Sequence, residues 1–308
     1  MTGMRVIGWG KALGEKLVTN DDLAQTLDTS DDWITERTGI RQRYIGGSVA
    51  SLGTQAAQRA LEVAGLTGSD IDMVLLATTT SDQIVPSTAV VIQAALGVTG
   101  GALDLNAACS GFAYGMVVAN GLLATGMKRI VLIGAEQLST ITDFSDRSTA
   151  VLFGDGAGAV VLEATDGPGD LLSSVLGSDG DLKHLLYAEH GGYLQMVGKE
   201  VFRKAVQVIV ESASEAMVKA GIGVDDLALM VPHQANLRII QAACQRLGID
   251  EAKAMVTVDK YGNTSAASIP LALVDAITEG RLQAGDLVLL TGFGAGMTWA
   301  SAILRWNP

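Results

Sequence analysis

The stretch LDLNAACSGFAYG, residues 103–115, contains Cys109, one of only two cysteines in a chain of 308 residues. The ALDL before it is typical of a buried strand, and the SGFAYGMVVANGLLATG after it has the pattern of a helix. The side chains between them are small: Asn106, Ala107, Ala108, Ser110 and Gly111. We therefore predict a strand-to-helix elbow, where the helix N-terminus lowers the pKa of the thiol and small neighbours let a substrate approach Cys109. A small cysteine buried in the core is the alternative interpretation.

Strand-like and helix-like segments alternate along the rest of the chain. The helical pattern TQAAQRALEVAG (54–65), for example, precedes the apolar run DMVLLATTT (72–80). Such alternation indicates α/β architecture with buried strands. Hydrophobic residues make up 48% of the chain and charged residues 18%, so we expect a large core and no extended disorder.

The two halves of the sequence resemble each other. Four pairs of segments match in the same order at nearly one offset: 57–66 with 213–222, 70–78 with 225–233, 103–110 with 258–265, and 129–134 with 286–292. We therefore predict a duplication, with one α/β half in residues 1–166 and the second in 167–308, joined near ATDGPGD (164–170). Generic similarity between α/β segments is the alternative interpretation.

Two polar residues in the second half of the chain lie at positions comparable to that of Cys109 in the first half. His233 follows the apolar run LALMVP (227–232), and Asn263 lies in the glycine turn KYGNTSAAS (260–268). Because ligand sites in open α/β sheets lie at the carboxyl ends of strands, the duplication predicts that Cys109, His233 and Asn263 converge in one cleft. These residue types suit covalent catalysis with proton transfer and hydrogen bonds to developing charge. A structural histidine and a turn asparagine are the alternatives.

Charge and hydropathy exclude several classes of function. The net charge of −12 argues against nucleic acid binding, which needs clustered lysines and arginines. No apolar run reaches the roughly 18–20 residues that span a bilayer. The first residues lack the apolar core and the cleavage site of a secretion signal. We therefore expect a cytoplasmic protein with free thiols and no membrane segment.

The remaining candidate features point away from metals and nucleotides. Cys244 lies among apolar residues at helical spacing, which favours core packing. His184 and His190 match no metal motif, so we predict no metal site. Neither glycine loop, FGDGAGAVV (153–161) or GFGAGMTW (292–299), matches a dinucleotide fingerprint. The second loop instead offers backbone N–H groups that suit an oxyanion hole.

The motifs DTSDDWITERTGIRQR, DLNAACSGF, FGDGAGA, VPHQANLRI, YGNTSAASIP and GFGAGMTW occur in this order along the chain. Together they resemble the signature segments of the beta-ketoacyl-[acyl carrier protein] synthase III family, in the thiolase superfamily. Chalcone-type synthases share the Cys/His/Asn set but would not be expected to carry DDWITERTGI. The resemblance implies a thiolase-like α/β fold, with two duplicated halves stacked as α-β-α-β-α layers, and a homodimer.

The resemblance also implies an activity, the first condensation of type II fatty acid synthesis. Cys109 takes the acyl group from an acyl-CoA, and the N–H groups of Cys109 and Ala295 hold the tetrahedral oxyanion. His233 and Asn263 hydrogen-bond the thioester oxygen of malonyl-acyl carrier protein as CO2 leaves, and the product is a 3-ketoacyl-carrier protein. No cofactor is implied, because the coenzyme A thioester is a substrate. A condensing enzyme or acyltransferase that handles starter units in polyketide or other secondary metabolism is the alternative.

Further residues are implied by the resemblance alone. Those for coenzyme A are Trp33, Arg37, Arg147 and Asn236, and those for docking the carrier protein are Arg203, Arg238 and Arg246. Trp33 and Arg37 are four residues apart on a predicted helix, so they share a face, which suits stacking on adenine. Surface packing is the alternative for the four coenzyme A residues. A local basic patch suits an acidic carrier despite the net charge, because salt screens exposed charges beyond about 10 Å.

Three departures from the family pattern bear on specificity. The loop between Asp181 and Met196 is shorter than is usual over the cleft. Ala295 replaces a glycine found in many members, but its N–H remains. Val85, before Pro86, stands where many acetyl-selective members carry phenylalanine near the acyl pocket. A smaller residue leaves more room, so we predict that branched or medium-length primers are accepted.

Overall fold

Two β-sheets form the framework of the fold in a computed structural model that describes residues 2–308. The first sheet has the strand order β1-β7-β6-β4-β5, with β1 (Thr2–Leu13), β4 (Met73–Ala77), β5 (Gly101–Leu105), β6 (Arg129–Gln137) and β7 (Asp155–Asp166). The second has the order β11-β12-β13-β8, with β8 (Leu171–Ser178), β11 (Leu227–Pro232), β12 (Leu287–Gly294) and β13 (Thr298–Arg305). Each half of the chain therefore builds one sheet.

The two sheets have the same topology. In the first, β4 is parallel to β6, while β7 is antiparallel to both of its neighbours, β6 and β1. In the second, β11 is parallel to β12, and β12, β13 and β8 follow antiparallel. The position that corresponds to β5 holds only an isolated parallel bridge between Met230 and Ala254. The predicted duplicated α/β fold is confirmed.

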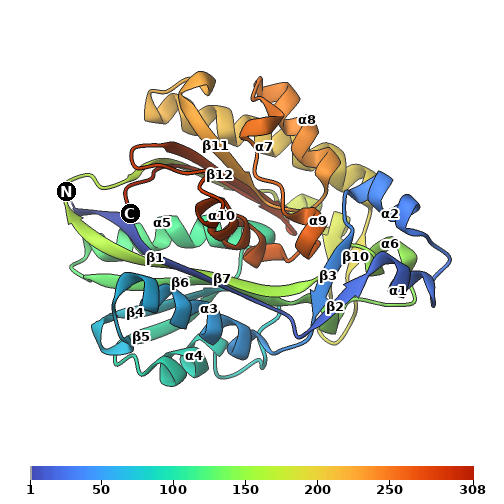
Figure 1. Cartoon of the computed structure of the whole chain (residues 1–308), viewed down its shortest axis with the longest axis horizontal. Helices are drawn as coiled ribbons and strands as arrows, with labels where there is room; N and C mark the ends of the chain where they lie inside the picture. Colours follow the sequence, from blue (N-terminus) through green and yellow to red (C-terminus); the bar gives the residue numbers. More distant parts are fainter. Residues whose placement is uncertain (1) are drawn as a thin grey trace.

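Helices form three layers that alternate with the sheets (Figure 1). The outer layer of the first half contains α3 (Val49–Ala64) and α4 (Thr88–Leu96), and that of the second contains α7 (Gly198–Ala220) and α8 (Leu237–Leu247). The central layer contains α5 (Gly111–Ala124) and α10 (Ser268–Thr278). This is the α-β-α-β-α arrangement expected from the resemblance.

Small residues let the layers approach closely. The buried face of α3 is rich in alanine, and β1 crosses it with glycines. A Cβ on Gly8 would lie 2.2 Å from the carbonyl oxygen of Ala60, so no larger residue fits there. Three large apolar clusters fill the spaces between the layers, the central one around α5 and α10 and one under each outer layer.

The other elements are short and cap the ends of the sheets. They are β2 (Lys16–Thr19), α1 (Asn20–Ala24), α2 (Asp31–Thr38), β3 (Gln42–Ile45), α6 (Arg147–Ala150), β9 (Leu186–Tyr187), β10 (Gln195–Met196) and α9 (Val258–Tyr261), besides several 3₁₀ turns. Within residues 2–308, no helix combines the length and the apolar character needed to cross a bilayer.

The connection between the two sheets is very short. Strand β7 ends at Asp166 and β8 starts at Leu171, so the predicted linker, 164–170, begins inside β7. We propose that the boundary between the halves lies in residues 167–170, close to the predicted division at 166/167.

Candidate active site

Two elbows that each lead into a central helix pack against each other in the middle of the molecule. The first is the 3₁₀ turn η2 (Ala108–Ser110), which leads into α5, and the second is η7 (Ser265–Ala267), which leads into α10. In the first elbow the Asn106 Oδ1 accepts a hydrogen bond from the Ala108 N–H (3.1 Å). In the second the Asn263 Oδ1 accepts one from the Ser265 N–H (2.9 Å). The two turns thus begin with the same asparagine-centred hydrogen bond.

Both elbows also hold a non-glycine residue in the left-handed region. The φ angle is 48° at Ala108 and 47° at Ser265. The equivalence of these residues corrects the predicted alignment, which set Cys109 opposite Thr264, whereas the structure sets it opposite Ala266. The offset grows by two residues because the segments between the matching elements differ in length.

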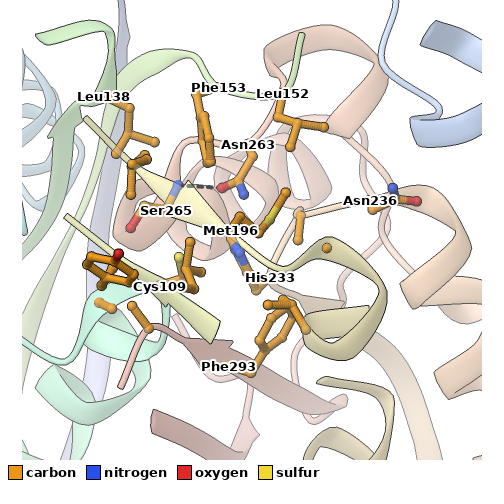
Figure 2. A pocket seen from close by; sticks show the side chains of 18 of the residues that line it. Cys109, Leu138, Leu152, Phe153, Met196, His233, Asn236, Asn263, Ser265 and Phe293 are labelled. Atoms are coloured by element: carbon orange, nitrogen blue, oxygen red, sulfur yellow. Dashed lines mark hydrogen bonds between the residues drawn. The ribbon is translucent and has the colours of Figure 1, made fainter. Parts of the chain in front are cut away.

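Cys109, His233 and Asn263 line one cavity of about 930 Å³ between the two halves, as Figure 2 shows. Asn106, Ala295 and Phe293 line it too. The three residues come from two elbows and from the end of β11, so they meet only because the two sheets stack with these ends facing each other. The predicted convergence of the three side chains is therefore seen in the structure.

The Cys109 thiol lies at the inner end of this cavity and is almost completely buried. Burial raises the pKa of the thiol to about 12, and the charge of Glu136 adds to the rise. The Ser265 side chain and the backbone N–H of Cys109 lower that pKa by less. The predicted lowering at the helix N-terminus is therefore wrong in net direction, because removal from water outweighs the favourable dipole. The thiol is protonated at neutral pH.

The imidazole of His233 is a neutral hydrogen-bond donor. Its Nδ1 is 2.6 Å from the Oγ of Ser268, and that Oγ accepts the N–H of Gln234 (3.3 Å). The Ser268 hydroxyl hydrogen is thus available to Nδ1, which favours the tautomer with the proton on Nε2. Burial lowers the pKa of His233 to about 3. Its Nε2 has no hydrogen-bond partner among residues 2–308.

The side chain of Asn263 is oriented by its own elbow. Its backbone N–H donates to the carbonyl of Leu152 (2.8 Å), and its carbonyl accepts the N–H of Gly154 (3.0 Å). Since Oδ1 is occupied by Ser265, the amide Nδ2 remains as the donor group of a side chain that lines the cavity. Asn263 and His233 therefore offer one N–H donor each.

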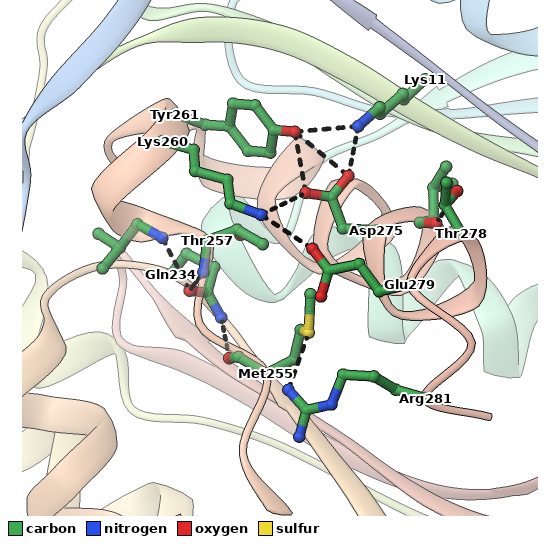
Figure 3. A network of polar contacts seen from close by, with 12 residues as sticks. Lys11, Gln234, Met255, Thr257, Lys260, Tyr261, Asp275, Thr278, Glu279 and Arg281 are labelled. Atoms are coloured by element: carbon green, nitrogen blue, oxygen red, sulfur yellow. Dashed lines mark hydrogen bonds and ion pairs between the residues drawn. The ribbon is translucent and has the colours of Figure 1, made fainter. Parts of the chain in front are cut away.

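A polar network anchors the second elbow from behind (Figure 3). The carboxylate of Asp275 on α10 is nearly buried, accepts the Tyr261 hydroxyl (2.9 Å) and forms ion pairs with Lys11 and Lys260. Tyr261 is two residues from Asn263, so the network ties α9 and α10 together on either side of it. A fixed backbone keeps a catalytic donor within the narrow geometry that it needs.

The turn that contains Ala295 is tied to the first elbow. The Thr298 hydroxyl donates to the carbonyl of Ala107 (2.8 Å), and Ser110 donates to the Thr298 oxygen (2.9 Å). A Cβ on Gly294 would lie 2.5 Å from the backbone nitrogen of Cys109, so β12 passes directly over the nucleophile. The backbone of Ala295 therefore lies near Cys109, as an oxyanion hole requires.

Aromatic and basic side chains cluster around Arg37, which lines the cavity, whereas Trp33 and Arg147 do not line it. The guanidinium of Arg37 lies 4.5 Å from the ring centroid of Trp33, and that of Arg147 lies 4.7 Å from it. Asn236 begins α8: its Oδ1 accepts the Arg238 N–H (2.8 Å) and its Nδ2 donates to the carbonyl of Arg37 (3.0 Å). The amide of Asn236 thus has a structural role in joining α8 to α2.

Comparison with known proteins decides the family. The 3-oxoacyl-[acyl-carrier-protein (ACP)] synthase III model matches residues 103–180, and the model of its C-terminal part matches residues 217–306. The beta-ketoacyl-[acyl-carrier-protein] synthase III of Agrobacterium fabrum is 50% identical over 318 residues, which cover 98% of each chain. The chain belongs to the beta-ketoacyl-[acyl-carrier-protein] synthase III family.

Solved structures of similar proteins have the same fold. The 3-oxoacyl-[acyl-carrier-protein] synthase III of Aquifex aeolicus superposes with a TM-score of 0.97 at 45% identity, covering 99% of this chain and 100% of that one. The priming beta-ketosynthase of the R1128 polyketide pathway superposes with a TM-score of 0.94 at 36% identity, covering 99% and 96%. The thiolase-like fold is thereby established.

One residue expected from the synthase III family pattern lies outside the cavity. Val85 was predicted near the acyl pocket, but its side chain is 80% exposed and does not line the cavity of this chain. The neighbouring Ile84 is also exposed. Both residues lie between β4 and α4. The expectation that Val85 lies near the acyl pocket therefore does not hold within a single chain.

The three arginines predicted for carrier docking are all exposed. Arg238 lines the cavity mouth, where its Nε donates to the carbonyl of Glu36 (3.1 Å). Arg246 lies in the last turn of α8. Arg203 lies on α7, in a second hollow of about 310 Å³. Only Arg238 therefore joins the cavity itself.

Sequence reasoning missed several residues around the nucleophile. Ser265 and Ser268 lie inside the quoted YGNTSAASIP motif, so their polar side chains at a helix start were a usable signal. Glu136 was visible only as a carboxylate at the end of an apolar strand. The short loop 181–196 forms a 3₁₀ turn with β9 and β10, and it contributes Leu186, Tyr187 and Met196 to the cavity wall. Within residues 2–308, no three His, Cys, Asp or Glu side chains group as metal ligands.

Proposed function

We propose that this chain condenses an acyl-CoA primer with malonyl-acyl carrier protein, releasing CO2 and giving a 3-ketoacyl-acyl carrier protein, the step that begins type II fatty acid synthesis. The observation that carries the proposal is the meeting of Cys109, His233 and Asn263 in one cavity of a synthase III family member. The identity to the polyketide priming enzyme is lower than to the Aquifex enzyme, so similarity favours this activity over the polyketide alternative.

The first half-reaction transfers the acyl group to Cys109. The sulfur attacks the thioester carbonyl, a C–S bond forms, and coenzyme A leaves as the thiolate. The N–H groups of Cys109 and Ala295 stabilise the tetrahedral oxyanion, and a donor of this kind is typically worth roughly 3–4 kcal/mol. Because burial holds the pKa of the thiol at about 12, its proton has to leave as the new bond forms.

The second half-reaction uses the two donors opposite the cysteine. The Nε2–H of His233 and the Nδ2–H of Asn263 bind the thioester oxygen of the malonyl group and stabilise the enolate as CO2 departs. The enolate carbon then attacks the acyl group and expels Cys109 as the thiolate. A neutral His233 suits this step, because decarboxylation needs donors at oxygen and no base at carbon.

Coenzyme A is proposed to bind at the cavity mouth through Trp33, Arg37, Arg147 and Asn236. The guanidinium groups of Arg37 and Arg147 both lie over the Trp33 ring, so an adenine ring that stacks on Trp33 competes with them. The displaced arginine is then available to the phosphates of coenzyme A. No cofactor is proposed, because the thioester itself is the substrate.

Two protein partners are proposed. An acidic carrier protein would dock on the exposed Arg203, Arg238 and Arg246, with Arg238 at the cavity mouth. A second copy of the chain would cover an apolar surface formed by the edge strand β5 and the segment around α4, whose exposed side chains are Ile84, Val85, Val90, Val91 and Leu103. In such a homodimer Val85 keeps its predicted role in primer choice only by reaching the partner's cavity.

Acyl transfer to the protein tests the proposed function directly. We would incubate the wild type, Cys109→Ala and Cys244→Ala with acetyl-, isobutyryl- or octanoyl-CoA and weigh the intact proteins. We expect an acyl adduct on the wild type and on Cys244→Ala, and none on Cys109→Ala, because Cys244 is packed in the core under α8. An equal adduct on Cys109→Ala would overturn the mechanism, and strict preference for acetyl-CoA would refute the predicted primer range.

A further inference from the structure

One arginine is completely buried without an anionic partner. Arg43 lies on β3, and no carboxylate among residues 2–308 forms an ion pair with it. Burial lowers the pKa of its guanidinium to about 10, so Arg43 keeps its charge at neutral pH. Burying a cation costs free energy that its hydrogen bonds alone have to offset. These hydrogen bonds are therefore the place to look for the role of Arg43.

The Arg43 guanidinium joins separate segments of the chain. Its Nη2 donates to the carbonyl of Val151 (2.8 Å). Its Nη1 donates to the Oδ1 of Asn20 (2.8 Å) and, over a longer distance, to the carbonyl of Val18 (3.4 Å). Val151 is the C-cap residue of α6, and Asn20 is the first residue of α1. One side chain thus links the end of α6 to the start of α1.

Asn20 extends this link to α2. Its side-chain Nδ2 donates to the Oδ1 of Asp31 (2.7 Å) and to the carbonyl of Ile40 (2.7 Å). Asp31 is the first residue of α2, and Ile40 directly follows the C-cap residue of that helix, Gly39. The buried amide of Asn20 therefore holds both ends of α2. Arg43 is one side chain away from that helix.

The two helices that Arg43 connects carry the side chains proposed for coenzyme A. Trp33 and Arg37 lie on α2, and Arg147 lies on α6 (Figure 1). The two guanidinium groups over the Trp33 ring, 4.5 and 4.7 Å from its centroid, thus come from different helices. Arg147 also donates to the carbonyl of Asp28, just before α2 (2.5 Å), but that contact is exposed to solvent. Exposed polar contacts fix a geometry weakly, so the buried link through Arg43 sets the spacing of α2 and α6.

Close packing restricts the stem of Arg43. A Cβ on Gly154 would lie 3.1 Å from the Arg43 Cβ, and a Cβ on Gly262 would lie 3.3 Å from it. Val18 and Val151, whose carbonyls accept the guanidinium hydrogen bonds, belong to a buried apolar cluster. A side chain held in this way has little freedom to shift, so it can keep two helices at a fixed spacing.

We propose that Arg43 is a positioning residue for coenzyme A, which holds α2 and α6 so that Trp33, Arg37 and Arg147 bind the nucleotide end together. Arg43 does not line the cavity, so it acts through the two helices and does not touch the thioester. Without the guanidinium the helices move separately, and binding coenzyme A then costs the free energy of ordering them. This inference rests on the proposed function, in which these side chains bind coenzyme A.

Two variants break the link at different points. Arg43→Met removes the guanidinium and keeps an apolar stem among apolar neighbours. Asn20→Asp leaves Arg43 an acceptor, but it replaces the amide that donates to Asp31 with a carboxylate that repels Asp31. The matched control is Arg281→Met, because Arg281 also joins two segments by donating to a backbone carbonyl, that of Ala252, and does not line the cavity.

The test follows acylation of Cys109 by intact mass with two acyl donors. One is acetyl-CoA over a range of concentrations, and the other is S-acetyl-N-acetylcysteamine, a thioester without a nucleotide. A residue that acts through the nucleotide site affects the first donor alone, whereas a loss of packing around the thiol slows both. Arg43→Met is also measured in a Trp33→Ala background, which shows whether Arg43 acts through Trp33.

We expect Arg43→Met to raise the acetyl-CoA concentration for half-maximal acylation about tenfold, with the maximal rate within about twofold of the wild type. Asn20→Asp changes the same quantity in the same direction. Acylation by S-acetyl-N-acetylcysteamine stays within about twofold in both variants. In the Trp33→Ala background Arg43→Met adds less than about twofold, and Arg281→Met has no effect with either donor.

Three outcomes would overturn the inference. They are wild-type dependence of Arg43→Met on acetyl-CoA, equal slowing of acylation by both donors, and the full tenfold effect in the Trp33→Ala background. If Arg43→Met fails to fold, Asn20→Asp decides by the same criteria. A wild type that forms no adduct with either donor, or a Trp33→Ala variant with wild-type dependence on acetyl-CoA, would instead refute the proposed function or its coenzyme A site. The two kinds of failure are therefore distinguishable.

Discussion

The two elbows of the active site, residues 106–111 and 263–268, share a backbone and differ in side chains. Both begin with an asparagine that accepts the N–H two residues on, both pass through a left-handed residue, and both open a central helix. The first then presents Cys109, where the second has Ala266. The first continues with Gly111, where the second has Ser268, which orients His233. One backbone thus supports a nucleophile in one half and hydrogen-bond donors in the other.

The difference shows how a duplicated fold divides its chemistry. The first elbow keeps small residues, which leave room for the acyl group beside the sulfur. The second elbow replaces them with polar residues: Asn263 and Ser265 line the cavity, and Ser268 holds the imidazole of His233. Variants that make one elbow resemble the other test this division.

The largest effect is expected from the two asparagines. Aspartate keeps the Oδ1 that each turn needs but replaces the amide donor with an anion. We expect Asn263→Asp to lower the rate of condensation about 10²- to 10³-fold, as loss of one oxyanion donor does, while the acyl adduct on Cys109 still forms. Asn106→Asp is the matched control and should cost much less. Product 3-ketoacyl-carrier protein and intact mass measure the two steps. Equal losses would mean that the two amides have the same role.

A smaller effect is expected at Ser268, which stands where the first elbow has Gly111. Ser268→Ala leaves the Gln234 N–H and the His233 Nδ1 without their buried partner, which typically costs about 1–3 kcal/mol. We expect condensation to slow about tenfold and acylation by acetyl-CoA to be unchanged. Ser212→Ala, a buried serine on α7 away from the cavity, is the control for stability. If acylation slowed as much as condensation, His233 would act in both steps.

The smallest effect is expected from the left-handed residue of the first elbow. Glycine adopts the φ of 48° without strain, so Ala108→Gly should change the free energy of unfolding by less than about 1 kcal/mol and keep acylation. Ala107→Gly, at a φ of −132°, is the control and should destabilise by roughly 0.5–1 kcal/mol. Urea unfolding measures both. Equal losses of stability would show that the left-handed turn stores no strain.

Much of the site was predictable because it rests on local patterns. Cys109 and His233 each follow an apolar run, Asn263 lies in a glycine turn, and the repeat predicted that they share a cleft. One prediction was wrong and one does not hold within a single chain, because longer-range packing decides both. The pKa of Cys109 rises because distant segments remove the thiol from water. Val85 lies on the surface of a single chain and does not line its cavity.

The sequence by itself determined the alternation of strands and helices, the duplicated halves and the residue types of the reaction, since these depend on periodicity and on turn chemistry. Only the tertiary structure decided how those residues work. It set the neutral tautomer of His233 through Ser268. It also buried Glu136 against Ala266, which lies 130 positions away along the chain. Protonation depends on burial and on neighbours brought together by folding, and a linear pattern contains neither.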